Sequence, residues 1–393
     1  MSVLVGKAKR IMPRDMLALS IMCLAAVACM LSVNLFFSSA RSSPRSLYLS
    51  SLETTHQQHE RSHFLQATYC QEFFPLASHG GSTYPIAKLA VDKLGERISR
   101  KPLPFRGMYV IGGGKDIVSD IIMGNGAFEV DEVQMYLKLL EQAETEGIAD
   151  PLFLDVGSNI GMHTLGVAAF GYRVFAVDAM RHNAHLLRSS LCLNPSLRVT
   201  FFNKALGSKA SKCILVAHQR NIGNGKLECD PNVINEFMKS PDRTYQELMY
   251  VQDLDIARLD SLLLSDVYVM KMDVEGFEEH VLNGMTNLLR NHAIHYMAME
   301  VNSDVQSEDA RQKLLWTVRK LGFVCTTNYQ FQPPYFPVAQ QVKDVVIPPN
   351  SWNIFCVDER RAHAAETGAT VGSLGPNPAI RPFLDELDKA FSA

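Results

Sequence analysis

Residues 152 to 161 read LFLDVGSNIG, an apolar run that ends in an aspartate and a pair of spaced glycines. Such a run is typical of a buried strand, and the helical spacing of apolar residues over 162–170 predicts a helix directly after it. Gly157 and Gly161 allow a tight strand-to-helix turn, while the start of the helix offers free N–H donors. The stretch therefore predicts a strand, a turn and a helix with a ligand at the turn.

Further apolar runs alternate with helical patterns along the chain, and this alternation predicts a doubly wound α/β fold with a mostly parallel, seven-stranded, Rossmann-like sheet. Ligands of such sheets bind beyond the carboxyl ends of the strands. The predicted strands are 152–156, 173–177, 199–203, 267–272, 294–301, 322–327 and 353–357, and the predicted helices are 162–170, 183–193, 277–291 and 307–321.

The glycine spacing argues against a phosphate ligand. The turn lacks the G-x-G start of a dinucleotide fingerprint, and Gly114-Lys115 fails as a P-loop because Asp116 follows the lysine. A nucleoside without phosphates is the alternative. Asp178 ends the second strand 21 positions after Gly157, where a carboxylate can accept hydrogen bonds from ribose hydroxyls. A packing turn and a helix cap are the structural alternatives for these two features.

Three carboxylates follow the predicted strand 267–272, in the sequence DVEGFE at 273–278. The two-residue period of a strand puts Asp273 and Glu275 on the same side. Carboxylates at this edge are costly unless they are solvated, paired or employed in chemistry. Helix capping by Glu275 and a dipole contact from Glu278 remain the structural alternatives.

The composition excludes one broad class of partner. Hydrophobic residues make up 47% of the 393 and charged residues 20%, and the net charge is −3. A globular protein without the basic excess of a nucleic-acid binder is expected. Six of the eight cysteines lie beyond residue 40. Six cysteines allow 15 pairings, and the sequence selects none.

An uncharged, mostly apolar run over 16–37 is long enough to cross a bilayer as a helix. Four basic residues precede it and two follow closely, which favours a cytosolic N-terminus over 1–15 and a type II orientation. Cleavage after the small residues at 38–40 is the alternative. We expect a polar stem over 38–63, an N-terminal helical cap over 64–110 and a loose tail over 361–393 with at most a short terminal helix.

Six motifs follow one another along the chain: LDVGSNIG at 154–161, VFAVDA at 174–179, KALG at 204–207, ARLDSL at 257–262, KMDVEGFEEHVLNG at 271–284 and MEV at 299–301. Together they resemble the FkbM family of S-adenosylmethionine-dependent methyltransferases. The resemblance covers residues 110 to 358 and implies a class I methyltransferase domain over about 111–360. Two departures are Asp178, where glutamate is frequent, and an insertion over 208–250 of unassigned content.

The resemblance implies an O-methyltransferase that acts on a hydroxyl of a sugar, a glycoconjugate or another small molecule. It assigns S-adenosyl-L-methionine to the turn: the methionine part to Asp155, Gly157, Ser158, Asn159 and Gly161, the ribose to Asp178, and the adenine to the backbone near Ala205 and Leu206. A membrane-anchored enzyme in the Golgi or another endomembrane lumen is the expectation. An inactive scaffold of the same fold and a methyltransferase with a non-sugar acceptor are the alternatives.

Methyl transfer needs alignment of the two reactants and a base for the acceptor hydroxyl. We expect Asp273 or Glu275 to be that base or to orient the acceptor, with His163 as a third candidate and Glu300 as an acceptor-binding residue. Packing of His163 against the cofactor, or a contact at a helix end, is the structural alternative. No metal is expected, because the histidine pairs 182/185 and 292/295, and the stem histidines at 56, 59 and 63, lack carboxylates that would complete a shell.

Overall fold

The computed structural model describes Cys70 and residues 84–209, 211–218, 221–245, 247–303, 305–347, 353–369 and 371–392. Seven strands form the central sheet in the order β13-β14-β12-β11-β3-β4-β5. Neighbours from β12 to β5 are parallel, whereas β14 runs antiparallel to both β12 and β13. The bounds are β3 Leu152–Val156, β4 Arg173–Asp178, β5 Val199–Asn203, β11 Val267–Met272, β12 Ile294–Glu300, β13 Phe323–Thr326 and β14 Asn353–Asp358.

The sequence-based prediction of a mostly parallel, seven-stranded sheet is confirmed, and every predicted strand lies within two residues of an observed one. Both faces of the sheet are covered, and all five residues of β3 and all six of β11 are buried. The strands therefore appear in the sequence as continuous apolar runs, and their positions could be predicted closely. The predicted helix 277–291 is instead two helices, α9 (Glu278–Asn283) and α10 (Thr286–Asn291), separated at Gly284 and Met285.

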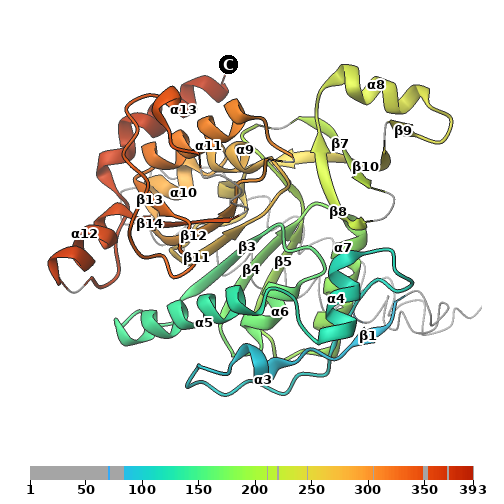
Figure 1. The fold of residues 1–393 in the computed structure, drawn as a ribbon, viewed down its shortest axis with the longest axis horizontal. Coiled ribbons are helices and arrows are strands. Elements are labelled where there is room, and N and C mark those ends of the chain that lie inside the picture. The colour runs from blue at the N-terminus through green and yellow to red at the C-terminus, as the bar shows by residue number, and fades with distance from the viewer. Residues whose placement is uncertain are drawn as a thin grey trace, which may run out of the picture. The chain divides into compact units, whose positions relative to one another are not determined.

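Helices cover the two faces of the sheet in two separate apolar cores (Figure 1). One face is covered by α5 (Val130–Thr145), α6 (Met162–Ala168) and α7 (Arg181–Leu193). The other is covered by α9, α10 and α11 (Glu308–Lys320), together with α13 (Arg381–Ser392). The central sheet therefore lies between two layers of helices. The edge formed by the carboxyl ends of its parallel strands is left to loops.

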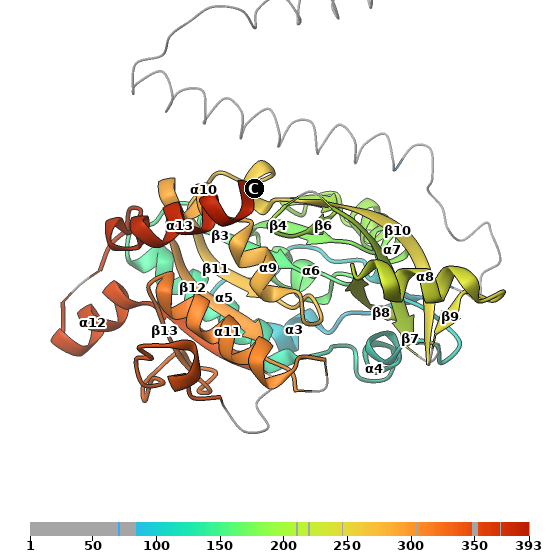
Figure 2. The ribbon, with the colours of Figure 1, turned by 90° about the horizontal axis from the view of Figure 1, so that it is seen from above.

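The insertion predicted over 208–250 forms a second, antiparallel sheet. Its strands are β7 (Lys212–His218), β8 (Asn221–Glu228), β9 (Thr244–Tyr245) and β10 (Leu248–Ala257), and α8 (Pro231–Lys239) joins two of them. The short strand β6 (Ala205–Leu206) follows β5 of the central sheet in the chain and pairs with β10. It therefore connects the insertion to the central sheet. Figures 1 and 2 place the insertion on the side of α7, away from α12 (Glu359–Thr367).

Two predictions about the flanks of the core are wrong. The described part of the predicted helical cap, 84–110, contains the antiparallel strands β1 (Ile86–Ala87) and β2 (Met108–Tyr109) and one four-residue helix, α3 (Val91–Leu94). The C-terminal segment is more than a loose tail with a short terminal helix, because α12, the short 3-10 turn η4 (Pro378–Ile380) and the 12-residue α13 are helical. In α13, Leu384 is fully buried and Asp388 accepts a hydrogen bond from Thr286 Oγ1 at 2.6 Å.

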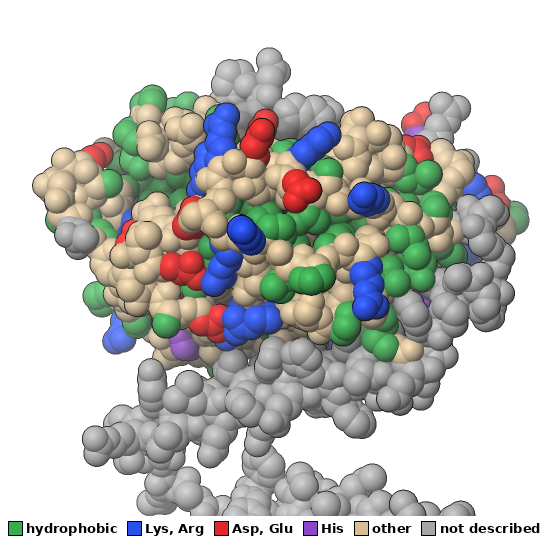
Figure 3. Space-filling view, turned by 90° about the horizontal axis from the view of Figure 1, so that it is seen from below, with side chains coloured by type: hydrophobic (Ala, Val, Ile, Leu, Met, Phe, Trp, Pro, Cys, Tyr) green, Lys and Arg blue, Asp and Glu red, His purple; other side chains and the backbone are tan. Residues whose placement is uncertain are grey.

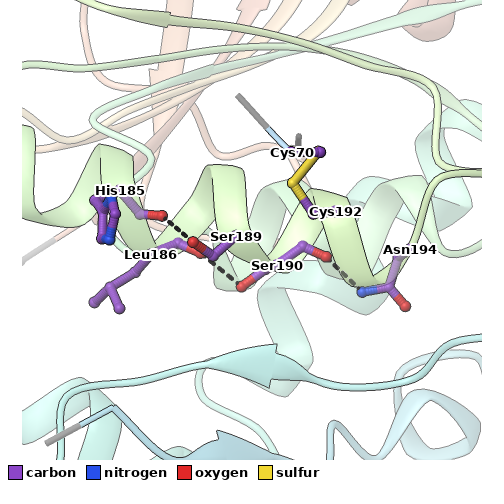
Figure 4. Close-up of a disulfide and its surroundings, with 7 residues drawn as sticks. All are labelled: Cys70, His185, Leu186, Ser189, Ser190, Cys192 and Asn194. Atoms are coloured by element: carbon purple, nitrogen blue, oxygen red, sulfur yellow. Dashed lines mark hydrogen bonds between the residues drawn. A yellow bond between two sulfur atoms is a disulfide. The ribbon is translucent and has the colours of Figure 1, made fainter. Parts of the chain in front are cut away.

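Three disulfides pair all six cysteines beyond the apolar N-terminal run: Cys70–Cys192, Cys213–Cys229 and Cys325–Cys356. The last joins directly opposed residues of β13 and β14. The first joins Cys70 to Cys192 near the end of α7 (Figure 4). In the same part of the helix, the side chains of Ser189, Ser190 and Asn194 donate hydrogen bonds to backbone carbonyls four residues earlier.

The predicted membrane anchor over 16–37, the N-terminal segment 1–15 and the stem over 38–63 lie outside the described residues. Among the residues that are described, none of the helices combines the length and the apolar character needed to cross a bilayer.

Candidate active site

The glycine turn after β3 lies directly against the segment that follows β11. Gly157 has a φ of +81°, and a Cβ added to it would stand 1.7 Å from the carbonyl oxygen of Asp273. The backbone N–H of Asp273 donates to the carbonyl of Val156 at 2.9 Å. Only glycine permits both this conformation and this contact. The glycine turn and the acidic segment therefore pack directly against each other at one edge of the sheet.

Asp178 holds the turn from the end of β4. One of its carboxylate oxygens accepts from the backbone N–H of Asn159 and the other from that of Met180, both at 2.8 Å. Burial raises the pKa of Asp178 to about 7, although these two hydrogen bonds oppose the rise. Asp178 therefore fixes the loop through these two hydrogen bonds. It also lines the cavity described below, and a helix cap alone would not need that position.

A cavity opens at this edge and gathers seven of the residues predicted for the site. Five were assigned to the cofactor and two to catalysis. They are Gly157, Asn159, Asp178, Ala205, Leu206, Asp273 and Glu275. Residues from three strand ends and from β6 thus meet where the fold class places its ligand.

Three other predicted cofactor residues do not line the cavity. Asp155 is fully buried and accepts a 2.6 Å hydrogen bond from Thr164 Oγ1. Ser158 is buried, with its hydroxyl unpartnered. Gly161 faces Leu187, and a Cβ there would lie 2.4 Å from the leucine Cδ1. These three residues therefore lie behind the turn and support it from outside the cavity.

The insertion supplies a wall of the cavity that the sequence did not predict. Its lining residues come from β7 and β8, and the wall is tied to α7 by a 2.8 Å hydrogen bond from Asn183 Nδ2 to the carbonyl of Gly223. No sequence motif marked this wall, although Gly223 and Gly225 on either side of Asn224 were a usable signal of close backbone approach. The insertion residues that line the cavity are Leu215, Gly223, Asn224, Gly225 and Leu227.

We expect the Cys213–Cys229 disulfide to stabilise this wall, since it closes the β7–β8 hairpin across 16 positions. Replacing both cysteines with serine should lower the free energy of unfolding by about 2–4 kcal/mol. Denaturant unfolding would measure the loss, and cofactor titration should show weaker binding. The matched pair Cys325→Ser/Cys356→Ser, in strands away from the cavity, should lose stability with unchanged cofactor affinity. Equal affinity in both double variants would contradict the role of the wall.

Lys271 organises the acidic segment from the buried strand β11. Its Nζ donates to the carbonyl of Gly157 and to Asp273 Oδ2, both at 3.1 Å. Burial lowers the pKa of Lys271, but the charges of Asp273 and Asp155 outweigh it and the net shift is upward. The ammonium therefore joins the glycine turn to the first carboxylate of the cluster. Sequence reasoning missed this residue, because a lysine within an apolar strand gave no indication of its partners.

Asp273, Glu275 and Glu300 form one cluster, with a carboxylate oxygen from each lying within 4.8 Å of the others. Burial, then the charge of Asp273, raises the pKa of Glu275 to about 7. Burial, then the charges of Asp273 and Glu275, raises the pKa of Glu300 to about 9. Asn302 Nδ2 donates to Glu300 at 3.0 Å. Asp273 and Glu275, which the strand period predicts on one side, therefore lie together with Glu300 at one edge.

The alternative roles considered for this segment apply to Glu278 and not to Glu275. Glu278 is fully buried, and one oxygen accepts from the backbone N–H groups of Val274 and Gly276 at 3.1 and 3.2 Å. Its other oxygen accepts from Gln306 Nε2 at 2.7 Å. Glu275 caps no helix, since the residue at the N-cap of α9 is Phe277, and its side chain lines the cavity.

His163, the third catalytic candidate, does not line the cavity. It lies in the first turn of α6 and is buried against α5, with Nε2 3.2 Å from Glu129 Oε2 and its ring edge-on to Tyr136. The first turn of α6 directs this side chain toward Glu129 at the start of α5 and not toward the cavity. This position favours a contact at the helix end over a catalytic role for His163.

Folding should favour protonated Asp178. A carboxyl group with a pKa of about 7 in the folded chain and about 4 when unfolded stabilises the fold at low pH. That contribution is fully present below the unfolded value and is lost as pH rises through 7. Asp178→Asn should therefore gain about 1–3 kcal/mol relative to the wild type between pH 5 and pH 8. Paired urea titrations at both pH values measure this difference, and a constant difference would contradict the burial of the charge.

The strand order, with one antiparallel strand inserted beside β12, and the cavity at the carboxyl edge define the class I methyltransferase fold. Residues 155–325 match the model of a methyltransferase FkbM domain. Residues 155–325 are therefore similar to FkbM methyltransferase domains, as the sequence motifs predicted.

The solved structures that match this chain have low identity to it. An FkbM methyltransferase from Methylobacillus flagellatus is 14% identical over 62% of this chain and 60% of its own, with a TM-score of 0.32. An O-methyltransferase from Bacillus cereus, solved with SAH, is 10% identical over 76% of this chain and 99% of its own, with a TM-score of 0.30. The match spans less than two thirds of the first protein. No curated protein sequence gives a significant match.

Proposed function

We propose that the protein transfers a methyl group from S-adenosyl-L-methionine to a hydroxyl of a sugar or glycoconjugate. One observation carries this proposal: the nucleoside-binding elements and two carboxylates line the same cavity. A scaffold without activity would not need Glu275 to be held at this position with a raised pKa.

The residues of the cavity fit the donor. Asp178 offers carboxylate oxygens at the end of β4, where the ribose hydroxyls of a nucleoside would lie. The backbone of Ala205 and Leu206 lies on the adenine side, and the turn at Gly157 and Asn159 on the methionine side. When bound there, S-adenosylmethionine would supply an electrophilic methyl group.

The chain's own residues align the acceptor and receive its proton. Glu275, whose pKa is raised to about 7 by burial and by Asp273, is suited to accept a proton at neutral pH. Asp273 is held by Lys271 and is placed to orient the acceptor. Glu300, which lies within reach of both carboxylates, is placed to bind a second hydroxyl. Alignment of this kind can contribute about 7–11 kcal/mol of barrier reduction.

We also propose that the protein is a type II membrane protein with its catalytic part in the Golgi or another endomembrane lumen. The support is the apolar run over 16–37 and the basic residues before it. The three disulfides are in keeping with an oxidising compartment. Protease protection in sealed microsomes tests the orientation: the domain should be protected until detergent is added, and degradation without detergent would contradict it.

A nucleic-acid acceptor is not proposed. On the face that Figure 3 shows, lysine and arginine side chains stand among acidic, apolar and neutral ones rather than in a continuous stripe. The net charge of −3 agrees with this distribution.

The activity is tested with the purified full-length chain in detergent. Titration calorimetry with S-adenosylhomocysteine should give one binding site, and radiolabelled methyl transfer should then identify the acceptor among neutral sugars, amino sugars, uronic acids and non-sugar alcohols. Binding with transfer only to a non-sugar alcohol would replace the sugar acceptor. Absence of binding would overturn the assignment of an enzyme.

A further inference from the structure

A second cluster of ligand-type side chains lies outside the cavity. Glu129 and Glu132 come from the start of α5, and His163 comes from the first turn of α6. One ligand atom from each of the three lies within 4.8 Å of the others. The proposed methyl transfer uses none of them.

His163 is the side chain that distinguishes this cluster from a group of surface acids. The residue is only 5% exposed, and no atom stands in hydrogen-bond geometry with its Nε2. That nitrogen lies close to two carboxylate oxygens, 3.2 Å from Glu129 Oε2, with which it forms an ion pair when protonated, and 3.8 Å from Glu132 Oε2. Metal–ligand bonds of about 2.1 Å put neighbouring ligand atoms about 3.0–3.4 Å apart. The spacing is therefore close to that of a first coordination shell.

Glu132 is also held in the way that metal ligands are held. Tyr136 donates its hydroxyl hydrogen to Glu132 Oε2 at 3.1 Å, and Asn353 Nδ2 donates to Glu132 Oε1 at 2.7 Å. Such partners fix the orientation of a ligand carboxylate. Asn353 comes from β14, so the cluster is braced by the sheet as well as by α5.

The net charge around the cluster is negative, which favours the binding of a cation. Among the described residues, the two carboxylates of the cluster and the nearby Asp155 interact with one permanent cation, Lys271, which also pairs with Asp273. A divalent ion would reduce this negative excess without reversing it. A buried charge needs such compensation.

We propose that Glu129, Glu132 and His163 bind a divalent transition-metal ion, with water completing the shell. One imidazole and two carboxylates suit Mn²⁺ or Zn²⁺ better than Mg²⁺, which prefers oxygen ligands alone. The histidine pairs weighed from the sequence belong to no such group of three among the described residues, whereas His163 does. The ion would fasten the start of α5 to α6, beside the lysine that holds Asp273.

Mn²⁺ binding to the full-length chain in detergent, stripped with EDTA and dialysed, tests the proposal. Titration followed by electron spin echo spectroscopy should show one bound Mn²⁺ with nitrogen modulation from a histidine. His163→Gln should remove the modulation and weaken binding at least tenfold. Glu129→Gln, at a side chain that is 34% exposed, provides a second variant that should fold, and it should also weaken binding at least tenfold.

The three carboxylates Asp273, Glu275 and Glu300 offer the matched control, because they form the other candidate group of three and contain no nitrogen ligand. Glu300→Gln should leave the affinity for Mn²⁺ and the nitrogen modulation unchanged. Three results would overturn the proposal: no stoichiometric binding, binding without nitrogen modulation, or loss of binding in Glu300→Gln with retention in both Glu129→Gln and His163→Gln. Each readout is independent of methyl transfer, so failure here leaves the proposed activity standing.

Discussion

Replacing Glu275 with glutamine is expected to lower kcat by about 10²–10⁴, with little change in the affinity for S-adenosylmethionine. Glutamine keeps the shape of the side chain and removes its ability to accept a proton. Because burial and the charge of Asp273 raise the pKa of Glu275 to about 7, the wild-type rate should fall as pH drops below 7. That dependence should be absent in the variant.

Steady-state rates between pH 5.5 and pH 9, with cofactor affinity measured separately by calorimetry, check this prediction. Glu247→Gln is the control, since its side chain is 87% exposed and lies outside the cavity. Asp273→Asn should also lower turnover with cofactor affinity nearly intact, and unchanged turnover would remove Asp273 from the mechanism. Full activity in Glu275→Gln, with the pH dependence retained, would exclude Glu275 as the base.

Replacing Gly157 with alanine is expected to abolish cofactor binding and to destabilise the fold by about 2–6 kcal/mol. An added Cβ would meet the carbonyl of Asp273 at 1.7 Å, which is backbone and cannot move aside as a flexible side chain can. The left-handed φ of +81° adds strain. The turn would therefore have to separate from the segment after β11.

Gly147→Ala is a matched control, because Gly147 has the same φ of +81° and nothing within 4 Å of the added Cβ. It should show only the conformational penalty, about 1–2 kcal/mol. The difference between the two variants in chemical denaturation isolates the effect of the contact. Equal losses in both variants, with cofactor binding retained in Gly157→Ala, would contradict the close approach of the two segments.

The sheet was predictable because its strands are buried on both faces and read as continuous apolar runs. The run at 267–272 includes Lys271, and it was still recognised because its neighbours are apolar. The meeting of Gly157 with Asp273 was also predictable, since parallel strands bring their carboxyl ends to one edge.

What the sequence did not predict depended on the direction of side chains and on contacts distant in sequence. The position of His163 in a helix was predicted, but its rotation toward α5 depends on the packing of α5 on the sheet. The wall around Asn224 comes from an antiparallel insertion whose register no local motif specifies. The loose tail over 361–393 was wrong because α13 is stabilised by burial of Leu384 against distant residues rather than by its local composition.

A crystal structure of the protein with S-adenosylhomocysteine would show directly whether the cofactor and the carboxylates share one site. We expect the ligand in the cavity between the turn at Gly157 and the wall at Asn224, with its ribose on Asp178 and its sulfur facing Asp273 and Glu275. A ligand bound elsewhere, or one whose sulfur faces away from both carboxylates, would contradict it.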